Sequence, residues 1–310
     1  MFHVEVEMQF IIFFIVLITL IVTGLIFINR LIEKLIGVRH KFSSTFNPAQ
    51  YRNSIPIKPQ IHQFKTFDGL TVCFSQFSPS SHPINGCIIL IHGIRYGKEY
   101  YYPVAAELVK NGYHCLVPDL RAHGESEGQY CTYGAKEKKD ISALIDYAER
   151  NLKLEGGISI WAHSMGASIG LLAMEHDPRI RFGILEAPFS DLHLIIQEYV
   201  RRKMPFLPKG FVNFVLTLAG RKAGFNPREI KPAIAARNIH NPVMLIHGRE
   251  DKRITLYHSQ EIYNQLPEDT KILFEINNGD HHNIREVWKD EYIERSLQFI
   301  KKSFSFLEYS

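Results

Sequence analysis

The feature that most constrains the fold is a repeated alternation between short, continuous apolar runs and segments with helical spacing. Continuous apolar runs are typical of strands that are covered on both faces. Strand-like runs lie at 87–92, 113–120, 158–161, 182–186, 242–247 and 271–276. Helices are expected near 101–110, 136–151 and 259–266, and from Met165 and Arg285 onward. This alternation predicts an α/β fold with a mostly parallel twisted sheet flanked by helices.

The start of the sheet should differ from the rest. Residues 61–77 contain two strand-like runs on either side of Asp68-Gly69, which is a strong hairpin signal. We therefore expect an antiparallel hairpin there.

A stretch without charged residues precedes this pattern. From Phe10 to Ile28 the chain has 19 uncharged, mostly apolar residues, which as a helix would cover about 28 Å. A cleaved signal peptide is one alternative, but two glutamates rather than Lys or Arg precede the run, and no small-residue cleavage site follows it. A buried core helix is another, but the run has no polar face. We predict a transmembrane helix over residues 10–29 after a short tail, residues 1–9.

The charges beside this run predict its orientation. The basic residues Arg30, Lys34, Arg39 and Lys41 follow it, and none precedes it. The positive-inside rule then places the rest of the chain in the cytoplasm. Residues 30–59 are predicted to be a basic juxtamembrane segment and linker, because 42–59 are rich in Ser, Asn and Pro. On this prediction the part from about residue 45 onward, with the main folded domain at 60–310, should be soluble without the tether. A formal net charge of +4 gives no broad basic face for nucleic acid.

Three polar residue types follow three of the predicted strands. Ser164 lies between the strand at 158–161 and the helix from Met165, with the small residues Ala162 and Gly166 two positions away on either side. A nucleophile on a tight strand-to-helix turn needs such small neighbours. A serine that merely caps the helix is the simpler alternative.

The other two residue types complete a possible triad. Asp251 follows the strand at 242–247, and His281 and His282 follow the strand at 271–276. The order serine, acid, histidine is one of the known triad orders. Asp251 could otherwise be a turn residue and the histidines surface residues.

Two backbone amides could bind a developing oxyanion. His92-Gly93 ends the strand-like run at 87–92, so the next amide, that of Ile94, could act together with the amide of Met165. His92-Gly93 could also do no more than turn the chain.

Metal and disulfide chemistry is not expected. The chain has neither a CxxC nor an HExxH motif, and Cys73, Cys87, Cys115 and Cys131 are expected to be buried thiols. We predict a protein with no cofactor and no metal.

These motifs together resemble the α/β-hydrolase superfamily. The matching segments are IHGI at 91–94, VPDLRAHGESEG at 117–128, AHSMGAS at 162–168, IHGREDKRI at 246–254 and GDHHNI at 279–284. The chain from about 60 to 305 is similar to the serine-nucleophile branch that includes monoacylglycerol lipase-like and serine aminopeptidase-like proteins found as membrane-anchored bacterial esterases. It departs from the family pattern at Ala162, which replaces the first glycine of the elbow.

The resemblance implies roles for several residues. Ser164 would be the nucleophile and Asp251 the acid, with Ile94 and Met165 as oxyanion donors. His282 is preferred as the base because its His-Asn order fits some family members, with His281 as the alternative. Residues 190–238 would form a helical cap with an apolar ceiling, and the loop at 119–128 would brace the site.

The expected function is that of a membrane-anchored serine hydrolase. It would cleave carboxylic esters or thioesters with an apolar acyl part, and its partners would be a small-molecule or lipid-like ester and, through residues 10–28, the membrane. Two alternatives stay open: a serine peptidase or amidase of the same fold, and a non-catalytic binding protein. The sequence leaves the oligomeric state undetermined.

Overall fold

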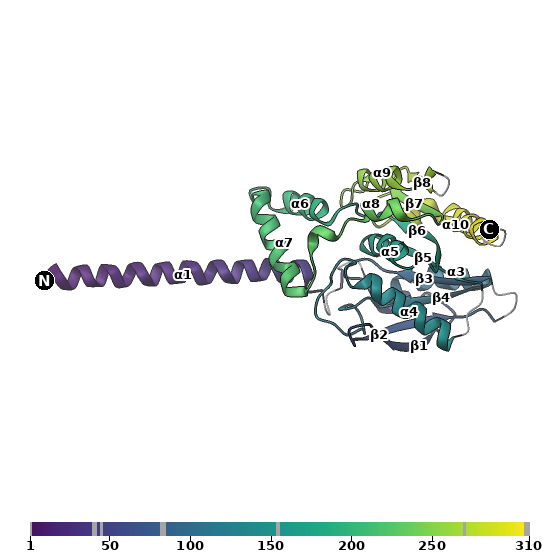
Figure 1. Ribbon diagram of the computed structural model, residues 1–310, viewed down its shortest axis with the longest axis horizontal. Coiled ribbons are helices and arrows are strands. Elements are labelled where there is room, and N and C mark those ends of the chain that lie inside the picture. The colour runs from purple at the N-terminus through teal and green to yellow at the C-terminus, as the bar shows by residue number, and fades with distance from the viewer. Residues whose placement is uncertain are drawn as a thin grey trace.

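An eight-stranded sheet forms the centre of the molecule (Figure 1). The computed structural model describes residues 2–38, 42–43, 46–80, 85–152, 156–268 and 271–306. In spatial order the strands run β1-β2-β4-β3-β5-β6-β7-β8. Their bounds are β1 Gln60–Lys65, β2 Thr71–Phe77, β3 Gly86–Ile91, β4 Tyr113–Pro118, β5 Ile158–His163, β6 Ile180–Glu186, β7 Val243–Gly248 and β8 Lys271–Ile276.

Strand direction follows the sequence pattern. β1 pairs antiparallel with β2, and β2 pairs antiparallel with β4. The remaining neighbours are parallel. The hairpin turns at Gly69, whose φ of 84° is a backbone conformation that favours glycine. The predicted α/β fold and its initial hairpin are confirmed.

Helices cover both faces of the sheet because successive side chains of the parallel strands point to opposite sides. In β3, Ile89 and Ile91 belong to one buried cluster and Ile88 and Leu90 to the other. The first cluster packs against α4 Glu137–Asn151 and α5 Met165–His176, and α9 Leu256–Gln265 packs beside β7 and β8. The second packs against α3 Tyr102–Lys110, which follows the 3-10 turn η1 Lys98–Tyr101, and against α10 Ile284–Phe306. All four cysteines are buried and free, as expected.

The interruption between β6 and β7 is helical. It contains α6 Leu192–Lys203, α7 Lys209–Ala223 and α8 Pro232–Ala235, with 3-10 turns η2 Pro227–Glu229 and η3 Ala236–Asn238. In Figure 1, α6 and α7 lie at the end of the domain from which α1 projects.

The first helix, α1 Phe2–Ile36, projects away from the domain over most of its length (Figure 1). Its part from Ile11 to Ile36 is long and apolar enough to cross a membrane, and its most apolar stretch has a mean hydropathy of 3.2 with no buried residue. Such a helix is also compatible with a signal sequence. The helix runs beyond the predicted end at residue 29.

The last two turns of α1 belong to the domain. Ile32 and Ile36 are buried in the core cluster. Cys131 N donates to Ile36 O at 3.0 Å, and Tyr133 Oη donates to Leu35 O at 2.5 Å. The prediction that residues 30–59 lie outside the folded domain, as a basic juxtamembrane segment and linker, is therefore wrong for residues 30–36, because contacts from a loop about 100 residues away hold them.

The second half of the predicted linker is also packed. α2 Pro48–Asn53 lies against η1 and α3. Phe46 is buried against Tyr96, and Arg52 Nη2 lies 2.6 Å from Glu99 Oε1. The described part of residues 42–59 is thus a strap across the domain instead of a flexible tether. The basic residues Arg39 and Lys41 lie outside the described residues.

Candidate active site

Ser164 lies on a sharp turn between β5 and α5. Its φ of 57° and ψ of −123° are rare for a residue with a side chain. Ser164 N donates to Glu186 O at 2.7 Å, which ties the turn to β6. A Cβ at Gly166 would come within 2.4 Å of Ile91 O, so only glycine lets α5 begin this close to β3. The strained strand-to-helix turn predicted from the sequence is therefore present.

Ala162, which replaces the first glycine of the family pattern, is accommodated in β5. It is fully buried and lies in register with Ile91 and Leu185. A Cβ at Gly170 would be 3.6 Å from the Ala162 Cβ, which is an ordinary contact distance. The expected departure from the pattern thus causes no visible displacement, because α5 presents Gly170 at this place.

Ser164, His281 and Asp251 form a continuous chain of contacts. His281 Nε2 lies 2.9 Å from Ser164 Oγ, and His281 Nδ1 lies 2.6 Å from Asp251 Oδ2. A carboxylate can only accept, so Nδ1 carries the proton, and Nε2 of the neutral ring is free to accept from the serine hydroxyl. All three residues are buried.

His282 points elsewhere, which corrects the preference for it over His281. Its Nδ1 lies 3.2 Å from Tyr96 Oη, and its ring is inclined by 82° to that of His281. Asp280 Oδ1 accepts from the amides of His282 and Asn283, at 2.7 and 2.9 Å, and so fixes the tight turn in which these rings diverge. Burial and the nearby charge of Arg253 lower the pKa of His282 to about 4.

The Asp251 carboxylate is held in one orientation. Its Oδ1 accepts from Arg253 N at 2.7 Å and Ile254 N at 2.9 Å, which leaves Oδ2 facing His281. Burial alone would raise the pKa of Asp251, but interactions with His247 and His281 outweigh it and hold the pKa well below its usual range. His247 Nε2 lies 3.6 Å from Asp251 Oδ2. The carboxylate is therefore ionised at neutral pH.

The two predicted oxyanion donors lie beside Ser164. A Cβ at Gly93 would be 3.2 Å from the Ser164 Cβ, so glycine lets the loop that carries Ile94 lie against the serine. Ile94 and Met165 line the same cavity as Ser164. Among the described residues neither amide has a hydrogen-bond acceptor, so both are free to donate to a ligand.

His92 fixes the loop that precedes Ile94. Its Nε2 accepts from Leu120 N at 3.1 Å and its Nδ1 donates to Gly93 O at 2.8 Å. Burial lowers the pKa of His92 to about 4, which keeps the ring neutral and this pattern intact. His92 thus positions the turn and does not face the cavity.

The loop at 119–128 has the bracing arrangement that the resemblance implied. Asp119 is fully buried and accepts from Lys98 N, Lys98 Nζ and Glu125 N at 2.7, 2.8 and 3.0 Å. A Cβ at Gly124 would overlap the Asp119 carboxyl group. This ion-paired loop supports the strand ends without contributing a side chain to the cavity.

A polar cluster under the elbow was missed from the sequence. The buried carboxylate of Glu186 accepts from Trp161 Nε1 and Tyr292 Oη and lies 3.4 Å from Arg285 Nη2. Burial would raise the pKa of Glu186, but the Arg285 charge and the hydrogen bonds lower it to about 2. Because Glu186 O also accepts from Ser164 N, this cluster anchors the serine turn. No short motif marks these scattered residues.

A cavity of about 620 Å³ opens onto two of the three contacting side chains. Ser164 and His281 line it, and the cap supplies much of its apolar wall, as expected from the resemblance. The cap residues are Ile195, Ile196, Tyr199, Met204, Leu207, Phe211, Val212 and Val215. Tyr96 also lines it, whereas the neighbouring Tyr100, Tyr101 and Tyr102 do not. The size and lining suit a ligand with an apolar chain.

Part of the cavity wall comes from α1, which was not expected from the sequence. The residues of α1 that line the cavity are Leu31, Lys34 and Leu35. Their spacing of three and four residues places them on one helix face. That spacing was the available signal, but it is present in most helices.

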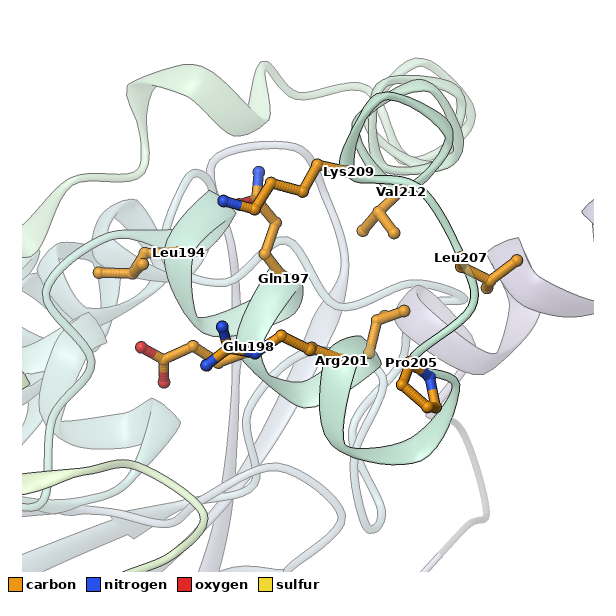
Figure 2. Close-up of a pocket in the computed structure, with 9 residues that line it drawn as sticks. Leu194, Gln197, Glu198, Arg201, Pro205, Leu207, Lys209 and Val212 are labelled. Carbon is orange, nitrogen blue, oxygen red and sulfur yellow. The ribbon is translucent and has the colours of Figure 1, made fainter.

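A second cavity of about 310 Å³ lies between α6 and α7 (Figure 2). It shares Leu207 and Val212 with the larger cavity, but none of the three contacting side chains lines it. Within the described residues no group of three or more His, Cys, Asp or Glu side chains could hold a metal ion.

The sheet order, the serine turn and the Ser-His-Asp contacts are those of the α/β-hydrolase fold, which the esterase Pf2001 shares, and they are consistent with the α/β-hydrolase superfamily. Residues 82–232 match the model of a family described as serine aminopeptidase, S33.

The chain is also similar to named relatives and to solved structures. The chain is 30% identical over 207 residues to the uncharacterized protein YqkD of Bacillus subtilis (strain 168), a match over 64% of this chain and 66% of YqkD. It is 29% identical over 143 residues to the quorum-quenching protein AidA of Acinetobacter baumannii (strain MDR-ZJ06), covering 45% of this chain and 47% of AidA. The fold is similar to that of the Pyrococcus furiosus esterase Pf2001, with a TM-score of 0.67, 23% identity and coverage of 86% of this chain and 99% of the esterase.

Proposed function

We propose that this protein is a membrane-anchored serine hydrolase that cleaves carboxylic esters or thioesters with an apolar acyl part. The observation that carries the proposal is the chain of contacts from Ser164 Oγ through His281 to Asp251 at an apolar cavity of about 620 Å³. A serine without a base at hydrogen-bond distance is a weak nucleophile.

In the proposed mechanism His281 takes the proton of Ser164 as Oγ attacks the acyl carbonyl carbon. The oxyanion accepts hydrogen bonds from the amides of Ile94 and Met165. His281 then gives its proton to the leaving alcohol or thiol, and an acyl-serine remains. Water attacks this acyl-enzyme with His281 again as base. Asp251 holds the tautomer of the ring and stabilises the imidazolium throughout.

The membrane anchor would be the exposed apolar part of α1. Residues 10–28 fit the thickness of the hydrocarbon layer, and the basic residues that follow favour a cytoplasmic hydrolase domain. Protease protection in sealed membranes would test this orientation.

The cavity favours ester over aminopeptidase chemistry. An aminopeptidase has to bind the positively charged amino terminus of its substrate, for which a carboxylate is the natural partner. No Asp or Glu lies among the described residues that line the cavity. We therefore favour an acyl ester or thioester over a peptide.

Covalent labelling separates catalysis from mere binding. A fluorophosphonate probe should label the full-length protein in detergent, and Ser164→Ala should abolish both labelling and hydrolysis of p-nitrophenyl butyrate, a loss of about 10³-fold or more. An inert Ser164 in folded protein would favour a non-catalytic binding role.

The two histidines should differ sharply. His281→Ala should lower kcat about as much as Ser164→Ala does, because both changes break the same chain of contacts. His282→Ala removes the contacts of this ring with Tyr96 and His281 and one side chain from the cavity wall. It leaves the contacts of His281 with Ser164 and Asp251 in place and should leave most of the turnover. The reverse result would restore His282 as the base.

A further inference from the structure

The wall that α1 contributes to the cavity lies close to the proposed membrane surface. The exposed apolar residues of α1 extend to Phe27, and the first cavity-lining residue is Leu31 and the last Leu35. At 1.5 Å per residue, this wall lies about 6–12 Å beyond the end of the apolar span. The head-group layer of a bilayer is about 5–7 Å thick on each side. The wall therefore falls at or just beyond the level of the lipid head groups.

The contacts of α1 make this position rigid. Tyr133 Oη donates to Leu35 O, and Arg95 Nη2 donates to Lys34 O at 3.0 Å. Lys222 Nζ on α7 lies 2.7 Å from Glu33 Oε1 on α1. The cavity, the cap and the span are thus held as one unit at the membrane surface, and the cavity does not move away on a long tether.

The cap adds exposed aromatic groups at the same end of the molecule. α7 contacts α1, and both cap helices lie where α1 leaves the domain (Figure 1). Phe206, between α6 and α7, is 76% exposed, and Phe214 on α7 is 51% exposed. Such side chains are suited to the interface between head groups and acyl chains.

Several positively charged side chains are among the residues that line the cavity. The basic residues among those lining it are Lys34, Arg95, Arg202, Lys203, Lys252 and Arg253. No described acidic residue lines it. Only Arg202 has a carboxylate within 4.0 Å, that of Glu198, in the part of the chain that the structure describes.

One of these basic residues, Arg95, has a buried N–H group that is available to bind a ligand. Arg95 Nε is buried and has no hydrogen-bond partner among the described residues. A buried N–H group without a partner is unfavourable unless a ligand or water satisfies it. Arg95 directly follows Ile94, the proposed oxyanion donor, so a ligand held by Arg95 would lie close to the reacting carbonyl.

We propose that the substrate is an acyl ester with an anionic, phosphate-bearing head group, taken from the membrane surface along the wall that α1 contributes to the cavity. This inference rests on the proposed function and names its substrate class. The acyl part lies against Leu31, Leu35 and the cap, and the head group lies among Arg95, Lys203 and Lys252. The reaction is the hydrolysis described above, in which water replaces the leaving alcohol.

The first test compares head groups on one acyl chain. Full-length protein in neutral vesicles would be given lysophosphatidylglycerol, lysophosphatidylcholine or monoacylglycerol, each with a palmitoyl chain. We expect kcat/KM to be at least about tenfold higher for the anionic ester, and this ratio to fall as salt is added, because exposed charges are screened. Equal rates would overturn the inference and leave the proposed hydrolase intact. Absence of both hydrolysis and fluorophosphonate labelling would instead defeat the proposed function itself.

Two pairs of lysine substitutions test whether the preference for the anionic ester comes from the cations that line the cavity. Lys203→Gln with Lys252→Gln should lower the ratio of anionic to neutral kcat/KM at least about tenfold. Lys209→Gln with Lys231→Gln removes the same charge from exposed residues that do not line the cavity, and should leave the ratio as it is. If both pairs lower the ratio equally, the cations only attract the protein to an anionic surface, and the substrate assignment is wrong.

A last comparison tests whether the protein takes its substrate from the membrane or from solution. Glycerophosphate esters with a short acyl chain dissolve in water, whereas their palmitoyl counterparts reside in vesicles. Leu31→Trp places a larger side chain on the α1 wall and so narrows the space beside it. This change should lower kcat/KM for the vesicle-bound ester at least about tenfold more than for the dissolved one. An equal effect on both would show that the substrate does not pass along α1.

Discussion

Replacement of Ile36 by alanine tests whether the end of α1 is part of the hydrolase domain. Ile36 is fully buried, whereas Leu25, on the same helix, is 61% exposed. A tether would tolerate both changes equally. A helix end that is built into the core would tolerate only the change at Leu25.

The expected loss of stability in Ile36→Ala follows from the burial of Ile36. Removal of a buried Ile side chain to Ala lowers the free energy of unfolding by about 2–5 kcal/mol, because apolar contacts are lost and a cavity remains. In a domain of this size each 1 kcal/mol shifts Tm by about 2–4 °C. We therefore expect Ile36→Ala to lower Tm by about 5–15 °C. Leu25→Ala should change it by about 1–2 °C at most, since its side chain faces detergent.

Intrinsic fluorescence can follow this transition in detergent micelles. Trp161 and Trp288, the two tryptophans of the chain, both lie in the domain and not in α1. Hydrolysis of p-nitrophenyl butyrate at low temperature would show whether the folded variant keeps its site. If Ile36→Ala is no more destabilising than Leu25→Ala, the packing of α1 against the domain is refuted.

Three further changes have defined outcomes. Deletion of residues 1–28 should leave a folded domain, whereas deletion of residues 1–44 should expose core residues and lower its unfolding free energy by several kcal/mol; equal urea midpoints for the two forms would contradict this. Gly166→Ala forces its Cβ into backbone oxygens and should lower kcat about 10²-fold, while Gly210→Ala, which has nothing within 4 Å, should leave kcat unchanged. The pKa of Glu186 is about 2 in the folded protein and 4.5 for the free group, so the ionised carboxylate stabilises the fold above pH 4.5, and this stabilisation is lost as pH falls toward 2. Between pH 7 and pH 3 the free energy of unfolding of the wild-type protein should therefore fall by about 2 kcal/mol more than that of Glu186→Gln. Urea titration at each pH would measure this difference.

The order of the main strands and helices could be predicted from local patterns in the sequence. Each strand of the parallel region is a continuous apolar run, and this signal is local, since a strand buried on both faces needs apolar side chains at every position. The positions of Ser164 and Asp251 follow from the same signal, because each comes within four residues of the end of such a run. The turn at Ser164 is also marked by Gly166, which the close approach of β3 requires.

Which histidine contacts the serine depends on contacts between distant segments of the chain. His281 and His282 have the same local surroundings in the sequence, so no spacing separates them. The choice is made by a turn that Asp280 caps and by Tyr96, which lies 186 positions before His282 and contacts its ring nitrogen. Contacts over such distances leave no local pattern.

The same reason explains the error at the end of α1. Residues 30–59 have the charges, prolines and polar residues of a linker, and composition reports only the local preference of the chain. Their burial comes from partners such as Cys131, Tyr133 and Tyr96, which the folded sheet brings to them. The sequence therefore determined where the strands and the reactive serine lie, whereas packing between distant segments decided that α1 ends as a wall of the cavity.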